Sequence, residues 1–276
     1  MSSLSKMSNL STTSQAFVDT YTLSDADAPW LSSLKNCAID RFSKDGLPTV
    51  RDEKWKYTNL NYLEHSEWTE AANDCEPGQF SWLTKEEAHR LVFVNGRFNK
   101  KFSTVGDLPY GAFIGSFTEA LTSQSAPLEA HLGKIATSLD SPLLALNAAL
   151  MEDGYVILLN NVKLTKKIEI IHVGRPNGQS VAYHPRNLVV LDHLSQATIW
   201  EQFTGAHTGT YFANSALEIV VDGGSLLQHH RVFADGAEAI EVATTGVNVG
   251  RDASYISFVL SDGGKLLRND LRVQLA

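Results

Sequence analysis

DGGSLLQHHRVF, residues Asp222–Phe233, joins a Gly-Gly corner directly to a strand-like run. The same order, a polar or small-residue corner and then an apolar residue, occurs in LSQATIW (194–200), RDASYIS (251–257) and DGGKLLR (262–268). Gly and Asp are typical of tight turns, because Gly accepts positive φ and Asp can hydrogen-bond its own backbone. The apolar residues after the four corners are Ile199, Leu226, Tyr255 and Leu266. The second half of the chain therefore predicts a repeating unit of strand, tight corner and strand.

Short strand-like runs fill the chain from Tyr155 onward. They cover residues 155–159, 168–174, 187–192, 197–203, 216–222, 225–233, 253–260 and 265–275. Within them apolar and polar residues alternate, as on a half-buried strand. Leu217, Ile219 and Val221 alternate with Glu218, and Leu267, Leu271, Val273 and Leu275 alternate with Arg268, Asp270 and Arg272. Alternation alone fits a β-sandwich or a β-solenoid. The similar corners favour a solenoid, whose rungs stack because none closes a core alone.

The first half of the chain carries helix signals instead. A helix is predicted from Asp27, its expected cap, through Pro29 in the first turn to a stop at Gly46. Trp30, Leu34, Ala38 and Phe42 share one face of that helix.

Three further local signals lie between residues 91 and 154. Asn95-Gly96 in LVFVNGRF predicts a two-residue hairpin turn, because both positions need positive φ. Ser116 and Glu119 have capping-box spacing. Ser141 and Pro142 predict the start of another helix, with Leu143, Leu146 and Leu150 along one side and Gly154 as its stop.

Composition excludes some classes of function. The 276-residue chain has 43% hydrophobic residues and a net charge of -8, and its longest basic clusters are the Lys100-Lys101 and Lys166-Lys167 pairs. Nucleic-acid binding needs a basic face, which is not indicated here. No run of 18 apolar residues is present, and the polar N-terminus lacks the apolar middle of a secretory signal. Cys37 and Cys75 match no zinc or redox spacing. We therefore expect a cytoplasmic protein with two unpaired thiols.

Catalytic motifs are also lacking. Nucleotide-binding glycine loops, GxSxG and HExxH do not occur. Asp222-Gly-Gly and Asp262-Gly-Gly offer one carboxylate per corner, too few oxygens for calcium, so turn chemistry explains them better. Glu201 and Glu218 would matter to a β-helix polysaccharide enzyme only if they shared a face.

The histidines are weak candidates for ligands. His229 and His230 are adjacent on a predicted strand and must point to opposite faces, so we expect one solvated ring and one ring with a partner. His184 and His193 could approach each other, and several histidines could meet on a solenoid face, but no spacing rule supports a site. That second group comprises His172, His193 and His207.

One stretch earlier in the chain is more specific. GLPTVRDEKWKYTNL contains Gly46–Thr49, then Glu53, then Trp55–Thr58. This order closely resembles the N-terminal signature of the SufD family (SufB/SufD family), the scaffold subunits of the Suf iron–sulfur cluster assembly system. LVFVNGRF, LNAALMEDGYVILL, PRNLVVLDHLSQATIWEQF and GGKLLRNDLRVQL are similar to later family segments, so the resemblance runs from about residue 28 to the end. On packing grounds, we expect Trp55 and Tyr57 to anchor a junction between helix and sheet.

The resemblance implies a three-part chain: an N-terminal helical region with the WKYT signature (1–90), a hairpin and helical transition segment (91–154) and a right-handed parallel β-helix (155–276). The family's C-terminal helical domain has no counterpart here, which we interpret as truncation. The implied function is non-enzymatic scaffolding with SufB, paired through the β-helix, and with the ATPase SufC, bound through the missing region, and a part in iron acquisition.

No catalytic, cofactor-binding or metal-binding residue is carried over, and iron or an iron–sulfur cluster is expected only in the full complex. Two other hypotheses stay open at this point: a carbohydrate-active β-helix enzyme and a generic β-solenoid interaction module.

Overall fold

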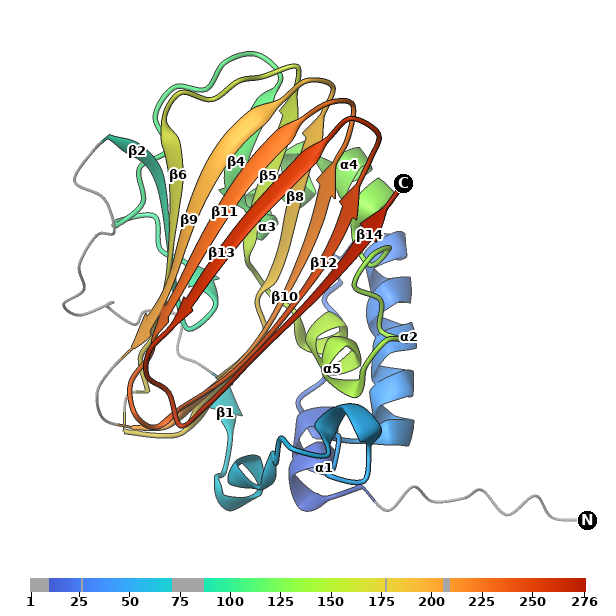
Figure 1. Cartoon of the computed structure of the whole chain (residues 1–276). Coiled ribbons are helices and arrows are strands. Elements are labelled where there is room, and N and C mark those ends of the chain that lie inside the picture. Colours follow the sequence, from blue (N-terminus) through green and yellow to red (C-terminus); the bar gives the residue numbers. More distant parts are fainter. Residues whose placement is uncertain (1–9, 26, 71–86, 177, 206–208) are drawn as a thin grey trace, which may run out of the picture.

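The computed structural model describes residues 10–25, 27–70, 87–176, 178–205 and 209–276, and strands dominate it (Figure 1). The helices are α1 (Thr12–Asp19), α2 (Pro29–Asp45), α3 (Phe117–Ser123), α4 (Ser125–His131) and α5 (Pro142–Leu150), with 3-10 turns η1 (Glu53–Trp55) and η2 (Asn61–His65). The strands before the repeating region are β1 (Thr69–Glu70), β2 (Ala88–Val94), β3 (Arg97–Phe98) and β4 (Ala112–Ser116). Those of the repeating region are β5 (Tyr155–Asn160), β6 (Lys167–Gly174), β7 (Val181–Tyr183), β8 (Arg186–Asp192), β9 (Gln196–Gly205), β10 (Tyr211–Val221), β11 (Leu226–Ala234), β12 (Ala239–Val249), β13 (Ser254–Ser261) and β14 (Leu266–Leu275).

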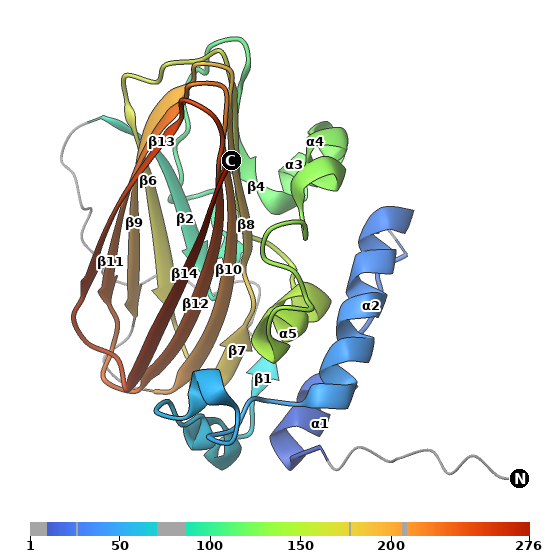
Figure 2. The same ribbon diagram turned by 45° about the vertical axis from the view of Figure 1, so that its right-hand side comes forward.

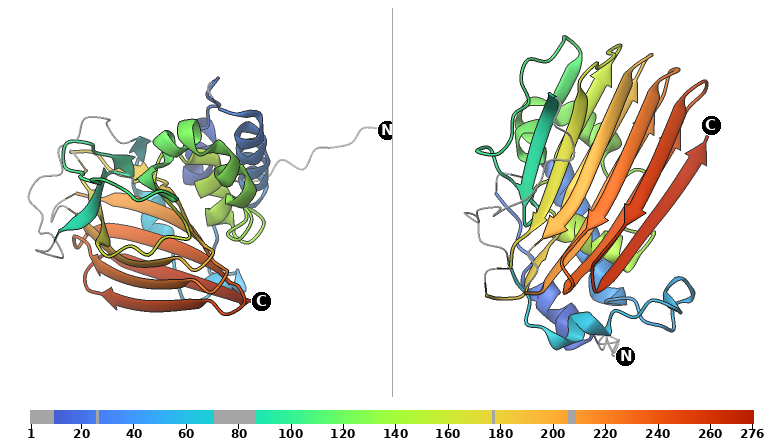
Figure 3. Two further views of the ribbon diagram at one scale, coloured as in Figure 1. Left: turned by 90° about the horizontal axis from the view of Figure 1, so that it is seen from above. Right: turned by 60° about the vertical axis from the view of Figure 1, so that its left-hand side comes forward.

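From β5 onward the chain winds between two sheets. One sheet contains β5, β8, β10, β12 and β14 as successive parallel neighbours, and the other contains β6, β9, β11 and β13. The right-hand view of Figure 3 shows successive rungs stacked in sequence order. Gln196, Leu226 and Ser254 are aligned across three rungs of the second sheet. The fold is therefore a parallel β-solenoid, as the repeated corners predict, and the sandwich alternative is wrong.

The corners themselves form ladders. Ser195 and Ser225, the serines of two quoted corners, are buried, and Ser195 N–H donates to Ser225 Oγ at 2.9 Å. Ser195 Oγ in turn accepts from the N–H of Val162 in the preceding rung at 3.2 Å. In these two corners the serine hydroxyl therefore satisfies a backbone N–H group of the neighbouring corner, which favours a small polar residue at this place.

The two sheets differ in what covers their outer faces. The helices pack on the outside of the sheet that contains β10, so β10 is buried on both faces along nearly its whole length (Figure 2). None of the described helices covers the sheet that contains β9, and β9 and β11 alternate buried and half-buried residues. The interior between the sheets holds the apolar core, including Leu91, Ile157 and Ile199.

Two strands of the repeating region, β7 and β12, do not correspond to any predicted run. β12 reads AIEVATTGVNV, with small residues and Thr in place of a clear alternation. Its first nine residues are buried because helical segments cover its outer side. A Cβ at Gly246 would lie 2.7 Å from Ile135, so the covering segment demands a small residue there. Burial on both faces removes the polar half of the pattern on which the prediction depended.

Helix α2 differs from its prediction at two residues. Ala28, not Asp27, is the N-cap and makes no side-chain capping bond, and Asp27 instead pairs with Lys35 at 2.8 Å. Cys37 is an exposed free thiol. Cys75 lies outside the described residues. Gly46 ends the helix with φ 64°, as predicted.

The signals between residues 91 and 154 are largely confirmed. Asn95 and Gly96 both have positive φ and connect the antiparallel pair β2–β3, and Ser116 caps α3 by accepting from Glu119 N–H. Ser141 caps α5. Gly154 does not stop that helix, because α5 ends four residues earlier, at Leu150. Gly154 instead immediately precedes β5 and lies against the backbone of Arg186, whose carbonyl oxygen would lie 2.2 Å from an added Cβ.

The WKYT stretch packs against the last rung. Trp55 is buried in the core shared by the helices and the sheet, and the Arg268 guanidinium of β14 lies 4.1 Å from its ring centroid. Arg268 Nη1 also donates to Lys54 O at 2.8 Å. Tyr57 is 90% exposed, so its predicted anchoring role is wrong. None of the described helices has the length and apolarity needed to cross a membrane.

Candidate functional site

A buried carboxylate occupies the middle of the solenoid interior. Glu201 of β9 shares the inward face with Ile199 and Phe203, because alternate residues of a strand point to the same side. Its side chain has no exposed surface. An ionised carboxylate is stable in such a place only when other groups supply hydrogen bonds and positive charge.

Three side chains from two neighbouring strands meet Glu201. His172 Nε2 of β6 lies 3.0 Å from Oε1, and His229 Nε2 of β11 lies 3.0 Å from Oε2. Arg231 of β11 stands directly opposite Glu201 in the ladder and donates from Nε to Oε2 at 2.8 Å. The Arg231 guanidinium also lies 5.0 Å from the ring centroid of Phe203. We call Glu201, His172, His229 and Arg231 the interior cluster.

The balance of charges in the interior cluster explains why Glu201 is ionised although it is buried. Burial alone would raise the pKa of Glu201, but the Arg231 charge and the hydrogen bonds from His172 and His229 outweigh it and hold this pKa well below its ordinary value. Burial lowers the pKa of His229, which favours its neutral form. A neutral His229 that donates from Nε2 to the carboxylate must accept at Nδ1, where the Tyr255 hydroxyl lies at 3.1 Å. The cluster is thus a chain of directed hydrogen bonds around one ion pair.

The cluster reaches the last two strands of the chain. Arg231 Nη1 donates to Thr245 Oγ1 of β12 at 3.1 Å and to Asn269 Oδ1 of β14 at 2.9 Å. Tyr255, the partner of His229, lies on β13. Polar contacts therefore continue through four successive rungs along the inside of the solenoid.

A second interior group lies near one end of the strands. Tyr211 donates its hydroxyl proton to Asp235 at 2.6 Å, and Ser215 donates to Glu241 at 3.0 Å. Burial raises the pKa of Asp235, and burial together with the nearby Asp235 charge raises the pKa of Glu241 well above its ordinary value. Unlike Glu201, Glu241 keeps a raised pKa, because burial outweighs the opposing effect of the Arg231 charge.

Glu218 lies on the other side of its sheet from the solenoid interior. It alternates with Leu217 and Ile219 as predicted, but its outward face is covered by residues 133–136. Its carboxylate accepts from four consecutive backbone N–H groups and pairs with the fully buried Arg186 at 2.5 Å. Glu201 and Glu218 therefore do not share a face, which removes the paired-carboxylate basis of the carbohydrate-enzyme hypothesis.

The candidate histidines also lie on different faces and in different parts of the fold. His229 points inward and His230 outward, as predicted, and His230 stacks on Trp200 with ring centroids 4.5 Å apart. His184 is buried beside Phe17, whereas His193 is exposed at a corner with φ 46°. His207 lies outside the described residues. The partners of His172 and His229 come from strands whose register the sequence does not reveal.

The interior cluster does not fit a metal ion. Both Glu201 oxygens already accept hydrogen bonds, and Arg231 brings a positive charge that would repel a cation. Over the described ranges no group of three or more His, Cys, Asp or Glu residues is arranged to hold a metal. What the cluster can do is hold successive rungs in one register.

The last rung presents an incomplete surface. Among the described strands, β13 pairs only with β11 and β14 only with β12. Val273 stands beside the core residue Val247, and it is 47% exposed because none of the described strands packs beyond it. The other exposed apolar residues of this rung are Ile256, Phe258, Val259, Leu260, Leu271 and Leu275. Open strand edges next to apolar side chains form a surface suited to pairing with another sheet.

The fold defines the class of the chain: a parallel β-solenoid with helices on one outer face. The chain belongs to the SufBD family, because it matches the SufBD protein N-terminal region over residues 13–170 and the SUF system FeS cluster assembly, SufBD core domain, over residues 174–276.

Similarity to curated relatives agrees with this assignment and indicates that the chain is SufD-like. It is 27% identical to the iron-sulfur cluster assembly SufBD family protein slr0076 of Synechocystis over 94% of its own length and 60% of the relative. It is 24% identical to the iron-sulfur cluster assembly protein SufD of Escherichia coli, covering 98% of the chain and 62% of the relative. For protein ABCI7, chloroplastic, of Arabidopsis thaliana the identity is 20%, with 94% and 56% covered. The chain thus spans about 60% of the length of these relatives.

Proposed function

We propose that this chain is part of a scaffold subunit for iron–sulfur cluster assembly. Membership in the SufBD family supports a role in iron–sulfur cluster assembly, and so do the relatives that are named for this process. The observation that carries a scaffolding role is the parallel β-solenoid, in which the outer edges of β13 and β14 and the apolar side chains beside them have no partner within residues 209–276.

Pairing with SufB through the solenoid is the proposed use of the last rung. An incoming strand could complete the backbone ladder of β13 or β14 while its side chains cover Val273 and Leu275. We further propose that SufC acts with the complex through a region beyond Ala276 and that the subunit contributes to iron acquisition. These partners rest on the family resemblance.

A non-catalytic role is proposed with them. The interior cluster brings several titratable side chains together, but it is buried. Its carboxylate already accepts hydrogen bonds from Arg231 and two histidines. A general acid or base needs a free site within reach of a substrate, and this cluster offers none.

Co-purification tests the proposal. The chain is expressed with an affinity tag together with SufB and SufC from its own host, and the captured proteins are quantified. Leu271→Asp places a charge on the open rung, where Leu271 is 44% exposed, and is expected to reduce SufB capture at least about tenfold. Leu139→Asp is the matched control, because Leu139 is 70% exposed and lies outside the strands.

Capture of SufB by the unaltered chain and by L139D, but not by L271D, supports the proposal. Equal capture by both variants would show that the open rung is not the pairing surface. Failure of the unaltered chain to retain SufB would overturn the proposed pairing itself.

A further inference from the structure

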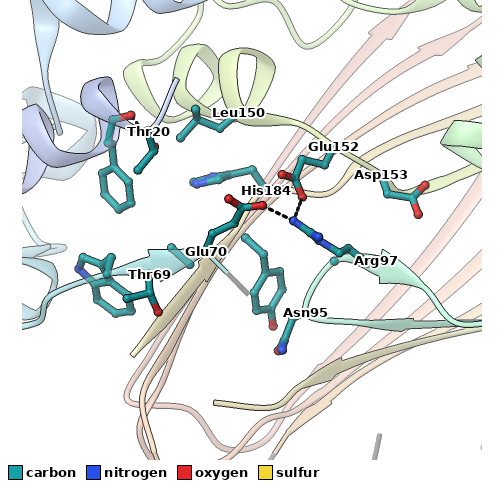
Figure 4. A pocket seen from close by; sticks show the side chains of 14 residues that line it. Thr20, Thr69, Glu70, Asn95, Arg97, Leu150, Glu152, Asp153 and His184 are labelled. Atoms are coloured by element: carbon teal, nitrogen blue, oxygen red, sulfur yellow. Dashed lines mark hydrogen bonds and ion pairs between the residues drawn. The ribbon is translucent and has the colours of Figure 1, made fainter. Parts of the chain in front are cut away.

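A pocket lies at the junction of the N-terminal helices and the first solenoid rungs, away from the interior cluster and the open rung. Its cavity volume is about 70 Å³. Its walls come from five places in the sequence: α1, the β1 region, the β2–β3 hairpin, the residues after α5, and the β7 region. Figure 4 shows Glu70, Glu152 and Arg97 converging on one side, with His184 between them and Thr20. Nothing in the scaffolding role uses this pocket.

The charged side of the pocket holds two carboxyl groups and one guanidinium. Arg97 Nη2 lies 2.5 Å from Glu70 Oε1 and also contacts Glu152 Oε2, so a single guanidinium serves two carboxylates. Burial raises the pKa of Glu152, and its hydrogen bond to Glu70 lowers the pKa of Glu70. The carboxylates are 68% and 50% exposed, whereas Arg97 is 21% exposed, so an arriving group meets the acidic atoms first.

His184 supplies a neutral donor in the same pocket. Asn214 Nδ2 donates one proton to Leu143 O at 2.9 Å and faces His184 Nδ1 at 3.2 Å, so Nδ1 accepts. Burial lowers the pKa of His184 to about 3, and the neutral ring therefore carries its proton on Nε2. Within the described part of the chain Nε2 has no hydrogen-bond partner, although the residue is only 8% exposed. This donor adds no charge that would repel a cation.

The remaining wall is apolar and aromatic. Phe17 packs edge-on to His184 with ring centroids 5.9 Å apart, and Leu150 lies beside them. Trp68 donates from Nε1 to Leu63 O at 2.7 Å, which fixes the orientation of its indole ring. Aliphatic stems pack well on such rings, and ring faces attract cations.

From this arrangement we propose that the pocket binds an organic cation on an apolar stem, a guanidinium or ammonium group as in Arg or Lys. The cation lies on Glu70 and Glu152, the stem contacts Phe17 and Trp68, and a carbonyl oxygen near the stem accepts from His184 Nε2. The proposal does not depend on the scaffolding role. The same chemistry could come from a free small molecule or from a basic side chain of a polypeptide.

The test is a titration of the whole 276-residue chain, followed by the indole N–H signal of Trp68 in two-dimensional NMR, with Trp68→Phe used to assign it. N-acetyl-arginine amide is the probe, and N-acetyl-citrulline amide is the matched ligand of nearly equal shape without charge. Both are added to about 10 mM, well above the range in which weak sites saturate. The peptide Ala-Ala-Arg-Ala-Ala distinguishes a polypeptide source from a small molecule.

Glu152→Gln is the test variant and Glu70→Gln the second, for use if the first does not fold. Glu129→Gln is the matched control, because Glu129 is exposed on α4, outside the pocket. We expect the unaltered chain to bind the arginine probe saturably and to bind the citrulline probe at least about tenfold more weakly. The E152Q variant should bind the arginine probe at least about tenfold more weakly than the unaltered chain, and E129Q should bind it equally well. Tighter binding of the peptide than of the single residue identifies a polypeptide ligand, and equal binding a small one.

Three results would overturn the proposal. They are the absence of saturable binding, equal affinity for the arginine and citrulline probes, and tighter binding of N-acetyl-aspartate amide, which would mean that Arg97 recruits anions instead.

Discussion

Replacing Glu201 by Gln removes the negative charge of the interior cluster while keeping the size of the side chain. Arg231 is only 4% exposed and would be left without a counter-charge, although it keeps Thr245 and Asn269 as hydrogen-bond partners. Breaking one side of a buried ion pair costs about 3–5 kcal/mol. We therefore expect E201Q to lower the free energy of unfolding by that amount.

Urea unfolding monitored by circular dichroism measures this change as a lower midpoint at an unchanged slope. Glu238→Gln is the control, because Glu238 pairs with Lys265 at 2.8 Å on the surface and should contribute no more than about 1 kcal/mol. Adding Arg231→Met to E201Q removes the stranded charge and should restore about half of the lost stability. A loss below about 1 kcal/mol in E201Q would refute the argument that the cluster is held by charge.

The difference in unfolding free energy between the unaltered chain and E201Q should depend on pH, because the pKa of Glu201 is lowered. A carboxylate with a folded-state pKa below its unfolded value stabilises the protein fully above the unfolded pKa and loses this contribution as the pH falls through the folded one. The difference between the unaltered chain and E201Q should be constant from neutral pH to about 4.5 and shrink only below it. A difference already lost at about pH 6 would contradict the lowered pKa.

Three further changes test other parts of the structure. Trp55→Ala should lower stability by about 3–5 kcal/mol, because its ring is buried beneath Arg268, and a small shift in melting temperature would refute this packing role. Gly154→Ala should cost at least about 1–3 kcal/mol, because the added Cβ would lie 2.2 Å from the carbonyl oxygen of Arg186, and unfolding at the original urea midpoint would contradict that contact. Glu241→Gln should make the chain at least as stable at pH 8 as the unaltered one. A raised folded-state pKa stabilises in acid and loses its contribution as the pH rises, so a less stable E241Q at pH 8 would contradict the raised pKa.

Local chemistry explains which features of the fold could be predicted from the sequence. The Asn95-Gly96 turn, the Ser116 and Ser141 caps and the Gly46 stop all depend on residues within one turn of each other. Corner residues recur because each rung repeats the same backbone path, so the solenoid could be predicted without any long-range contact. Where the local signal was ambiguous, as at Asp27 and Gly154, the prediction missed the observed cap or helix end.

Only the tertiary structure decided which side chains meet. Glu201 and Arg231 are 30 positions apart and become neighbours because the register of β9 and β11 aligns them. Alternation placed Glu218 on an outward face, but burial of that face required residues 133–136 to pack on it. Arg268 meets the backbone of Lys54 across 214 positions. Register and helix packing are set by the summed contacts of whole sheets, and a pattern with a period of two residues contains no information about either.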